Sequence, residues 1–276
     1  MREIMRGPRA RVQERVNKLS YAKPIVLADA YGVRFILEPW DAATKRDRMS
    51  GEFYRDEFSA LEKLINEGDT VFDLGANIGL HTALFSRWVG DAGRVLAFEP
   101  VPETAWHLRE TLALNRCANV EVFEMAILDR SGYAEMNTFS QKYAAWNSFG
   151  KPAFGGVQPN GVATVPIRDL DSFCNDEHIH RISFLKIDVE GFEKSVILGA
   201  RELLSANRIE SLSFEISQIP LAGSGVKPKE IFDALGVHGY ASYRFDPKTQ
   251  SFVGPVHDSD AFYENFYASQ RNLTGE

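Results

Sequence analysis

Short runs of apolar residues alternate with amphipathic segments along most of this chain. The strand-like runs lie at residues 70–75, 94–100, 120–127, 182–188 and 211–217. Helical spacing of apolar residues follows at 81–89, 103–115 and 193–205. Continuous apolar strands that alternate with helices are typical of parallel strands buried on both faces. The pattern predicts an α/β fold, with a doubly wound, mostly parallel sheet whose strand ends share one ligand-binding edge.

Further elements are expected on both sides of this alternation. Residues 25–39 indicate a hairpin around a turn at Tyr31 and Gly32, and an amphipathic helix precedes Gly68. After the last strand-like run, the sequence predicts a loop at 220–229, a helix at 231–236, and two strands near 241–245 and 251–254.

Residues 140–161 interrupt the pattern, because they are rich in Gly, Pro, Asn and aromatic residues and show no clear period. We expect irregular strands or a cover over the functional site there. The expected organisation is a basic arm at 1–20, an N-terminal hairpin and helix start at 21–60, and a main domain at 61–276 that carries this cover at 139–162.

The composition is that of a folded globular protein. The 276 residues are 44% hydrophobic and 25% charged, so the chain can bury a sizeable core. The net charge of −7, from 31 basic and 38 acidic residues, disfavours a sequence-independent nucleic-acid binder. The arm has six basic and two acidic residues and carries +4, which leaves −11 for the remainder. We expect the arm to contact a second subunit in a homo-oligomer.

Cysteine content and hydropathy bear on the compartment. Two cysteines, Cys117 and Cys174, are too few for a disulfide framework or a four-ligand zinc site. No apolar run approaches the roughly 18 to 20 residues that span a bilayer, and the N-terminus lacks the apolar core of a signal peptide. We therefore expect free thiols in a cytoplasmic protein without a membrane partner.

The most informative segment is DLGANIG at residues 73–79, between an apolar strand and a helix. Gly75 and Gly79 allow a sharp turn close to a ligand, and the helix start presents unpaired N–H groups. A dinucleotide fingerprint requires glycine where Asn77 stands, and the carboxylate of Asp73 would repel a pyrophosphate. An NAD-dependent dehydrogenase is therefore a disfavoured alternative.

A cationic nucleotide cofactor fits these residues better. S-adenosylmethionine carries an ammonium and a sulfonium group and no phosphate, so Asp73 would attract its amino-acid end. Glu99 ends the next strand, where an acid accepts hydrogen bonds from the ribose hydroxyls in nucleotide-binding α/β folds. We expect S-adenosylmethionine at this edge of the sheet.

Several segments, taken in order, resemble the FkbM family of S-adenosylmethionine-dependent methyltransferases. They are DLGANIG, FEP, VEVFEMAILDRSG, LDSF after VPIRD, FLKIDVEGFE and SFEIS, and KIDVEG at 186–191 is the most specific. The resemblance covers about residues 41–215. It implies the class I Rossmann-like fold, a seven-stranded sheet with an antiparallel last strand, and methyl transfer to oxygen on small molecules such as sugars, glycosides and polyketide-type natural products.

The resemblance also implies which residues hold the cofactor. The turn after the first strand would hold the methionine moiety, the end of the second strand the ribose, and the run after it the adenine. In that order the residues are Asp73, Gly75, Asn77 and Gly79, then Glu99, then Ala126 and Ile127, with Asp188 also against the cofactor.

Methyl transfer requires in-line alignment and removal of a proton from an alcohol. Asp188 falls at the end of the fourth strand, Glu190 opens the following helix, and Glu215 lies on the neighbouring strand. Asp188 or Glu190 would serve as general base, or the pair would orient the acceptor hydroxyl. The acids also leave open a divalent cation on Asp188 and Glu215, with neutralisation by Lys186 as the alternative.

Other candidates lie outside these strand ends. His81 follows the Gly-rich turn closely enough to be a catalytic base at neutral pH, with packing on the helix face as the alternative. An acceptor pocket with aromatic, hydroxyl and amide groups would suit a sugar or polyol. Its candidates are Tyr54, Glu57, Tyr143, Trp146, Asn147, Ser148 and Glu215.

The leading interpretation is an O-methyltransferase that acts on a small-molecule acceptor. The alternatives are a nucleic-acid or protein methyltransferase and a non-catalytic binding protein of the same fold. The acidic charge argues against RNA, and no D/N-P-P-Y/F motif for amine methylation is present. The acids of KIDVEG argue against loss of turnover.

Overall fold

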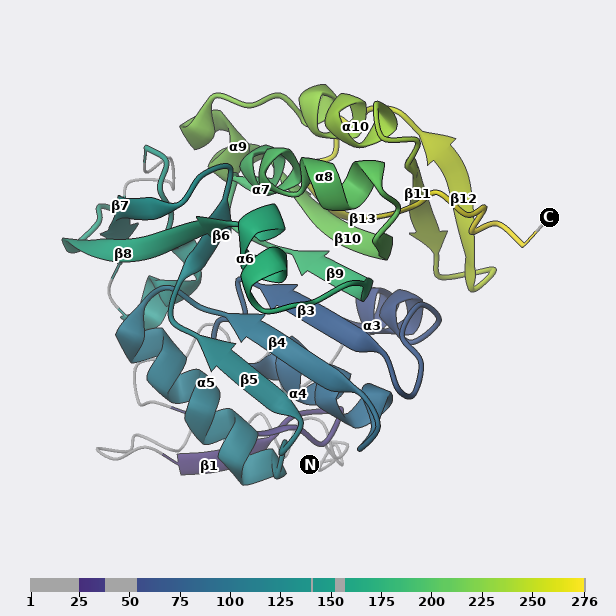
Figure 1. Cartoon of the computed structure of the whole chain (residues 1–276). Helices are drawn as coiled ribbons and strands as arrows, with labels where there is room; N and C mark the ends of the chain where they lie inside the picture. Colours follow the sequence, from purple (N-terminus) through teal and green to yellow (C-terminus); the bar gives the residue numbers. More distant parts are fainter. Residues whose placement is uncertain (1–24, 38–53, 140, 152–156, 276) are drawn as a thin grey trace, which may run out of the picture.

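The computed structural model describes residues 25–37, 54–139, 141–151 and 157–275. Its centre is a sheet of eight strands, β3 (Thr70–Leu74), β4 (Arg94–Phe98), β5 (Val120–Phe123), β9 (Ile182–Ile187), β10 (Ile209–Ser217), β11 (Ala241–Asp246), β12 (Ser251–Val256) and β13 (Tyr263–Ser269). The order across the sheet is β12-β11-β13-β10-β9-β3-β4-β5 (Figure 1). Strands β5, β4, β3, β9 and β10 are parallel, whereas β13 runs antiparallel to both of its neighbours.

Helices cover both faces of this sheet, which confirms the doubly wound prediction. They are α3 (Arg55–Leu61), α4 (Leu80–Val89) and α5 (Pro102–Asn115) on one face, and α6 (Leu170–Asp176), α7 (Glu193–Gly199), α8 (Arg201–Ser205) and α10 (Pro228–Gly236) on the other. In Figure 1, α6, α7 and α8 lie in front of the sheet and α4 lies behind it. Neighbouring side chains point to opposite faces, so Phe72 packs in the α6 to α10 core while Val71 packs against α3 and α4.

Two smaller sheets flank the central one. The predicted N-terminal hairpin is present as β1 (Ile25–Ala28) and β2 (Arg34–Leu37). The Asn115 side chain accepts from the Arg34 N–H at 2.9 Å and donates to its carbonyl at 2.6 Å, which fastens the hairpin to α5. A second sheet has the order β6-β8-β7, with β6 (Ala126–Leu128), β7 (Gly132–Thr138) and β8 (Gly161–Asp169). The 3-10 helix η1 (Gln141–Trp146) lies between β7 and β8.

The structure corrects several sequence predictions. The central sheet has eight strands instead of seven, because the β11–β12 hairpin adds an edge strand and β13 enters between β10 and β11. The predicted run at 120–127 divides into β5 and β6, which belong to different sheets. The run at 193–205 divides into α7 and α8 at Ala200. The helix before Gly68 ends early, at Leu61.

The predicted loop at 220–229 is also wrong in part. Helix α9 (Gln218–Ser224) occupies its first half, although Pro220 and Gly223 favour a loop in sequence alone. The carbonyl of Pro220 packs so tightly on Gly191 that a side-chain carbon there would lie 2.5 Å from its oxygen. This helix therefore supports the turn that follows β9.

Other predictions concern the termini and the compartment. The basic arm at 1–20 lies outside the described residues, so its contact with a second subunit stays a prediction. Cys117 and Cys174 are both free thiols, as expected. Among the described residues, no helix combines the length and apolar character required to cross a bilayer.

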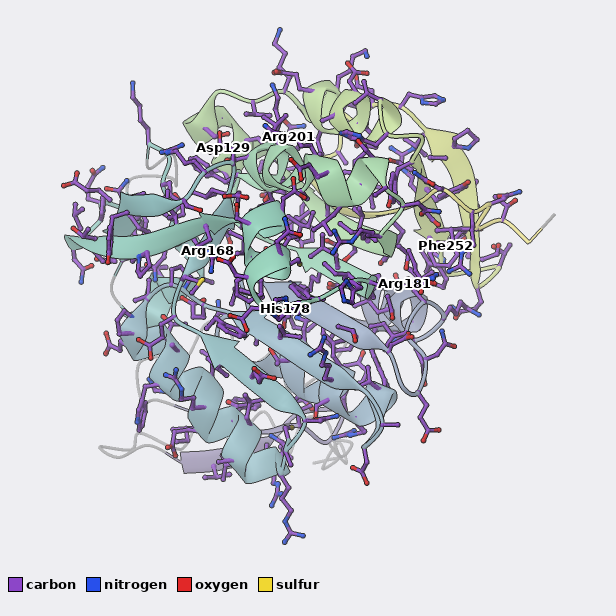
Figure 2. The ribbon with its side chains drawn as sticks, viewed as in Figure 1. Asp129, Arg168, His178, Arg181, Arg201 and Phe252 are labelled. Carbon is purple, nitrogen blue, oxygen red and sulfur yellow. The ribbon has the colours of Figure 1, made fainter. Side chains whose placement is uncertain are left out.

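The strand order places a crevice at the carboxyl ends of β3 and β9. From β3 the chain moves outward through β4 and β5, and it returns to add β9 and β10 on the other side. Ligands bind at such a reversal of strand order in open α/β sheets. Arg181, which pairs with Glu210, lies at the start of β9 and so at the opposite end of the strand (Figure 2).

The LDSF segment has a structural role. The carboxylate of Asp171, on α6, is buried and accepts the backbone N–H groups of Glu202 and Leu203 at 2.9 and 3.0 Å. These N–H groups belong to the first turn of α8, where no helical partner exists. Asp171 thus joins two helices on the front face of the sheet.

We predict that Asp171→Ala lowers the free energy of unfolding by about 1–3 kcal/mol, because it leaves two N–H groups without an acceptor. Urea denaturation followed by circular dichroism measures this change. The control is Asp233→Ala, which removes an exposed pair with Lys229 on α10 and should cost at most about 0.5 kcal/mol. Equal losses in the two variants would show that Asp171 is no more than a surface charge.

Candidate functional site

A cavity of about 330 Å³ opens at the carboxyl ends of β3, β4, β9 and β10. The turn after β3, strand β6, the start of β13, and the end of η1 with residues that follow it complete its wall. It brings together most of the residues singled out in the sequence, namely Tyr54, Gly75, Asn77, His81, Glu99, Ala126, Ile127, Trp146, Asn147, Asp188, Glu190 and Glu215. The predicted site residues Asp73, Gly79, Glu57, Tyr143 and Ser148 lie outside this lining.

The turn after β3 is held in a conformation that favours glycine. Gly75, Asn77 and Gly79 have φ angles of 80°, 50° and 90°. The N–H groups of Gly75 and Ala76 both donate to the carbonyl of Phe98. A side-chain carbon at Gly75 would lie 1.8 Å from the carbonyl oxygen of Asp188, so only glycine lets this turn touch the end of β9. Gly79 is the N-cap of α4 and packs against Leu108.

Glu99 follows β4 and lines the cavity with a buried carboxylate. Its two oxygens accept the N–H groups of Asn77 at 3.1 Å and Val101 at 3.0 Å. Burial raises the pKa of Glu99 to about 7, against these two hydrogen bonds, which lower it. The carboxylate is therefore fixed in place and changes charge near neutral pH.

Asp73 lies one layer behind the cavity. Its carboxylate is fully buried, and it accepts the hydroxyl of Thr82 at 2.6 Å through Oδ2. Its Oδ1 lies 3.8 Å from the ammonium of Lys186 and has no hydrogen-bond partner among the described residues. Its predicted contact with the methionine end of a cofactor stays a prediction.

Lys186 joins Asp73 to Asp188. The ammonium is buried and donates to Oδ2 of Asp188 at 2.8 Å. Burial by itself would lower the pKa of Lys186, but the carboxylates of Asp188 and Asp73 outweigh it and raise this pKa above its usual value. Lys186 therefore stays charged between two anions at the reversal of strand order.

The predicted acids gather on one wall. Glu215 on β10 is buried. In the parallel pairing of β10 with β9, Phe214 lies beside Ile187, so the next residues, Glu215 and Asp188, are neighbours. Burial and the nearby carboxylates raise the pKa values of Glu215 and Glu190 well above the ordinary range. The cluster thus holds protons that isolated carboxylates would lose.

Glu190 does not open a helix, contrary to the sequence prediction. It lies in a turn with φ of 51°, and the helix begins three residues later at Glu193. The buried carboxylate of Glu193 accepts the N–H groups of Gly191 and Val189 at 3.1 and 3.4 Å. Burial raises its pKa to about 7. Glu193 thus holds the turn that points Glu190 into the cavity, a role that its sequence position did not reveal.

Tyr263 is a site residue that sequence reasoning missed. It lies on β13, opposite Ser217 of β10, and lines the cavity. Its hydroxyl, as a hydrogen-bond donor, lowers the pKa of Glu215. Burial and the carboxylates of Glu215, Glu57 and Asp188 raise the pKa of its phenol, which therefore stays protonated. Only the antiparallel pairing of β10 with β13 reveals this neighbour.

His81 and the helix α3 form another wall. Nε2 of His81 lies 2.9 Å from Oε1 of Glu57, and both side chains are mostly buried. The imidazole also meets the rings of Tyr54 and Phe58 edge to face at 5.7 and 5.1 Å. Glu57 is not part of the cavity lining, but it contacts His81, which is.

The segment between β7 and β8 contributes aromatic and amide groups. Trp146 and Asn147 line the cavity, and the ring of Tyr143 stacks on Trp146 at 4.7 Å behind it. Oδ1 of Asn147 accepts the N–H of Phe139 at 2.9 Å. Ser148 is buried and exchanges backbone hydrogen bonds with Asn137, so it fixes the segment instead of facing the cavity.

The sequence left open whether a divalent cation or Lys186 neutralises the acids of this wall, and the structure favours Lys186. Lys186 already occupies one oxygen of Asp188. Within the described parts of the chain, no three His, Cys, Asp or Glu side chains are grouped so as to hold a metal ion.

Comparison with known proteins identifies the family. Over residues 73–243 the chain matches the family model described as the methyltransferase FkbM domain. The chain belongs to the FkbM methyltransferase family. It is therefore an S-adenosylmethionine-dependent methyltransferase with the class I fold, which confirms the resemblance seen in the sequence.

Named relatives are similar over much of the chain. The 2-O-methyltransferase NoeI of Sinorhizobium fredii is 27% identical over 175 residues, which are 59% of this chain and 69% of that protein. The hexuronic acid methyltransferase AglP of Haloferax volcanii is 26% identical over 211 residues, 76% of this chain and 79% of that protein. Among solved structures, fibrillarin of Aeropyrum pernix with bound S-adenosylmethionine superposes with a TM-score of 0.41 and 17% identity. The matched region is 92% of this chain and 85% of the fibrillarin chain.

The cavity of this FkbM methyltransferase fits its cofactor chemically. When bound, S-adenosylmethionine supplies a methyl group on a positively charged sulfur. Glu99 offers a fixed carboxylate for the ribose hydroxyls, and Ala126 and Ile127 offer apolar surface for the adenine. The acidic wall suits a cation, and no basic side chain of the described lining is left without a carboxylate partner, since Lys186 pairs with Asp188 and His81 with Glu57.

We predict that cofactor affinity rises with pH through the pKa of Glu99. Ribose hydroxyls donate to the ionised carboxylate, so below pH 7 binding must first remove its proton. Between pH 6 and pH 8, the dissociation constant of S-adenosylhomocysteine should fall about tenfold, the change expected for one group with a pKa of about 7. Isothermal titration calorimetry at several pH values measures this.

Glu99→Gln should weaken binding and remove most of this pH dependence. Glu103→Gln is the matched control, because Glu103 is exposed at the start of α5, close in sequence. It should keep both the affinity and the pH slope of the wild type. A slope that persists in Glu99→Gln would mean that another group titrates.

Proposed function

We propose that this enzyme transfers the methyl group to a hydroxyl of a small molecule, a sugar, glycoside or polyketide-type natural product. The observation that carries the proposal is the wall of three carboxylates, Asp188, Glu190 and Glu215, beside the residues that fit the cofactor. Transfer to an alcohol needs a group that accepts its proton, because a neutral hydroxyl is a poor nucleophile.

The environment of these acids suits that task. Carboxyl groups with raised pKa values hold and release protons closer to neutral pH than exposed ones. The remaining demand is alignment of the hydroxyl oxygen with the methyl group, which the cavity walls supply by restricting the acceptor. Burial of Glu215 limits the access of water to the same position.

The rest of the lining supports a sugar or polyol as the acceptor. Tyr54 and Trp146 present aromatic surface for C–H groups, and the amide of Asn147 and the hydroxyl of Tyr263 can fix hydroxyl groups. The names of the relatives agree, since one is a 2-O-methyltransferase and another methylates a hexuronic acid.

The other interpretations receive less support. The net charge of −7 and the acidic cavity oppose a nucleic acid, whose phosphates would meet the carboxylates. A non-catalytic binding protein would not require a set of buried acids, whose desolvation costs stability unless a function retains it.

We predict O-methylation in a screen with S-adenosylmethionine that carries a deuterated methyl group. The acceptors are methyl glycosides, a matched glucuronide, polyketide-type alcohols, an isoaspartyl peptide and RNA. Mass spectrometry should find the label on a hydroxyl oxygen of a glycoside or another alcohol. Label found only on nitrogen, on the peptide or on RNA would refute the proposed function.

We predict that Trp146→Ala raises the KM for the acceptor at least about fivefold, because truncation of a buried aromatic contact costs on the order of 1–2 kcal/mol or more. The affinity for S-adenosylhomocysteine should change little. Steady-state kinetics and calorimetry separate the two effects. Tyr133→Ala, at an exposed aromatic residue of β7, is the control and should leave both constants unchanged; a similar loss there would point to general destabilisation.

A further inference from the structure

The ion pair between Lys186 and Asp188 limits what Asp188 can do. Its Oδ2 accepts the buried ammonium at 2.8 Å, while its side chain is 31% exposed toward the cavity. A proton on this carboxylate would leave Lys186 with only Asp73, at 3.8 Å, as counter-charge. Removal of one partner from a buried ion pair is costly. Asp188 is thus committed to its ion pair with Lys186.

Glu215 has a different environment one strand away. It is buried, lines the cavity, and forms no ion pair with a Lys, Arg or His of the described residues. The groups that face it are Asp188 and Glu190 after β9, Glu193 on α7 and Tyr263 on β13. Three of these four are carboxyl groups, so each favours the protonated form of Glu215.

Tyr263 orients this carboxyl group. Tyr263 lies on β13, whose register with β10 places it opposite Ser217 and diagonal to Glu215. Its hydroxyl, as a hydrogen-bond donor, lowers the pKa of Glu215. Since the donor occupies one lone-pair position, a second position of Glu215 is available toward the cavity. His81 has no comparable freedom, because its Nε2 is engaged with Glu57.

We infer that Glu215 is the catalytic residue that accepts the proton of the acceptor hydroxyl, that Tyr263 is its positioning residue, and that Asp188 with Lys186 serves as a fixed charge pair. This inference rests on the proposed function. In the step, an oxygen lone pair of the acceptor forms the new C–O bond, and the C–S bond breaks with its electron pair left on sulfur. The O–H bond breaks, and its proton goes to a carboxylate oxygen of Glu215.

The protonation of Glu215 can be tested without an acceptor. In protein with 13C-labelled carboxyl groups and bound S-adenosylhomocysteine, several NMR resonances should titrate above the usual range, and the one that vanishes in Glu215→Gln belongs to Glu215. Tyr263→Phe should move that titration to higher pH, because the lost hydrogen bond favours the ionised form. Tyr133→Phe is the matched control and should not move it. A Glu215 resonance that stays ionised down to pH 5 in the wild type would overturn the inference.

Activity gives the second test, with a glycoside that the wild type methylates. Glu215→Gln should lower kcat by about 10²–10⁴ and abolish the fall in rate toward acid pH. Asp188→Asn should keep this acidic limb of the pH profile, the fall in rate toward acid pH. The limb should shift to lower pH, because one negative charge beside Glu215 is lost. Tyr263→Phe should lower kcat more than it changes KM and move the limb to higher pH. A limb that persists in Glu215→Gln and disappears in Asp188→Asn would assign the base to Asp188 instead.

Two checks keep these outcomes separate. Glu215→Gln and Tyr263→Phe should bind S-adenosylhomocysteine as the wild type does. If Glu215→Gln fails to fold, Glu215→Asp replaces it and should retain the acidic limb at a lower rate. If the wild type methylates no alcohol in the screen, the proposed function fails, while the carboxyl titration still decides whether Glu215 holds the proton.

Discussion

The ammonium of Lys186 is the interaction on which the site depends. It lies buried at the reversal of strand order. Lys186 is directly opposite Asp73 where β3 pairs with β9, and it precedes Asp188 by two residues in the sequence. Two carboxylates at this depth would repel each other without it, and each would face a large desolvation cost. The charge of Lys186 offsets both carboxylates at the place where the Gly-rich turn approaches the end of β9 so closely that only glycine fits at position 75.

Given that anchor, chemically similar side chains acquire different properties from their surroundings. Asp188 is paired, Glu99 is held by two backbone N–H groups, and Glu193 closes a turn. Glu190 and Glu215 face other carboxyl groups, and their pKa values are raised for that reason as well as by burial. Acids at one edge of the sheet therefore differ in pairing, hydrogen bonding and pKa, and these differences are set by their neighbours and not by residue type.

The sequence predicted the parts whose signal is local. Continuous apolar strands, the DLGANIG turn and the acids at strand ends located the sheet edge and several residues of the cavity lining. It could not predict β13, because Glu264 and Asn265 interrupt its apolar pattern although it pairs on both sides. Nor could it predict that Asp73 lies behind the wall or that Glu57 acts through His81, since both depend on side-chain contacts between distant segments.

The position of β13 has a consequence for how the molecule is completed. This strand is the only link, within the described sheet, between β10 and the β11–β12 hairpin. A chain that stopped before Tyr263 would leave β10 with an open edge, exposed to pairing with other chains, and a hairpin with no sheet to join. The strands β3 and β4 pair with none of these residues. During synthesis on the ribosome, β3, β4 and the Gly-rich turn therefore emerge well before β13 completes the sheet.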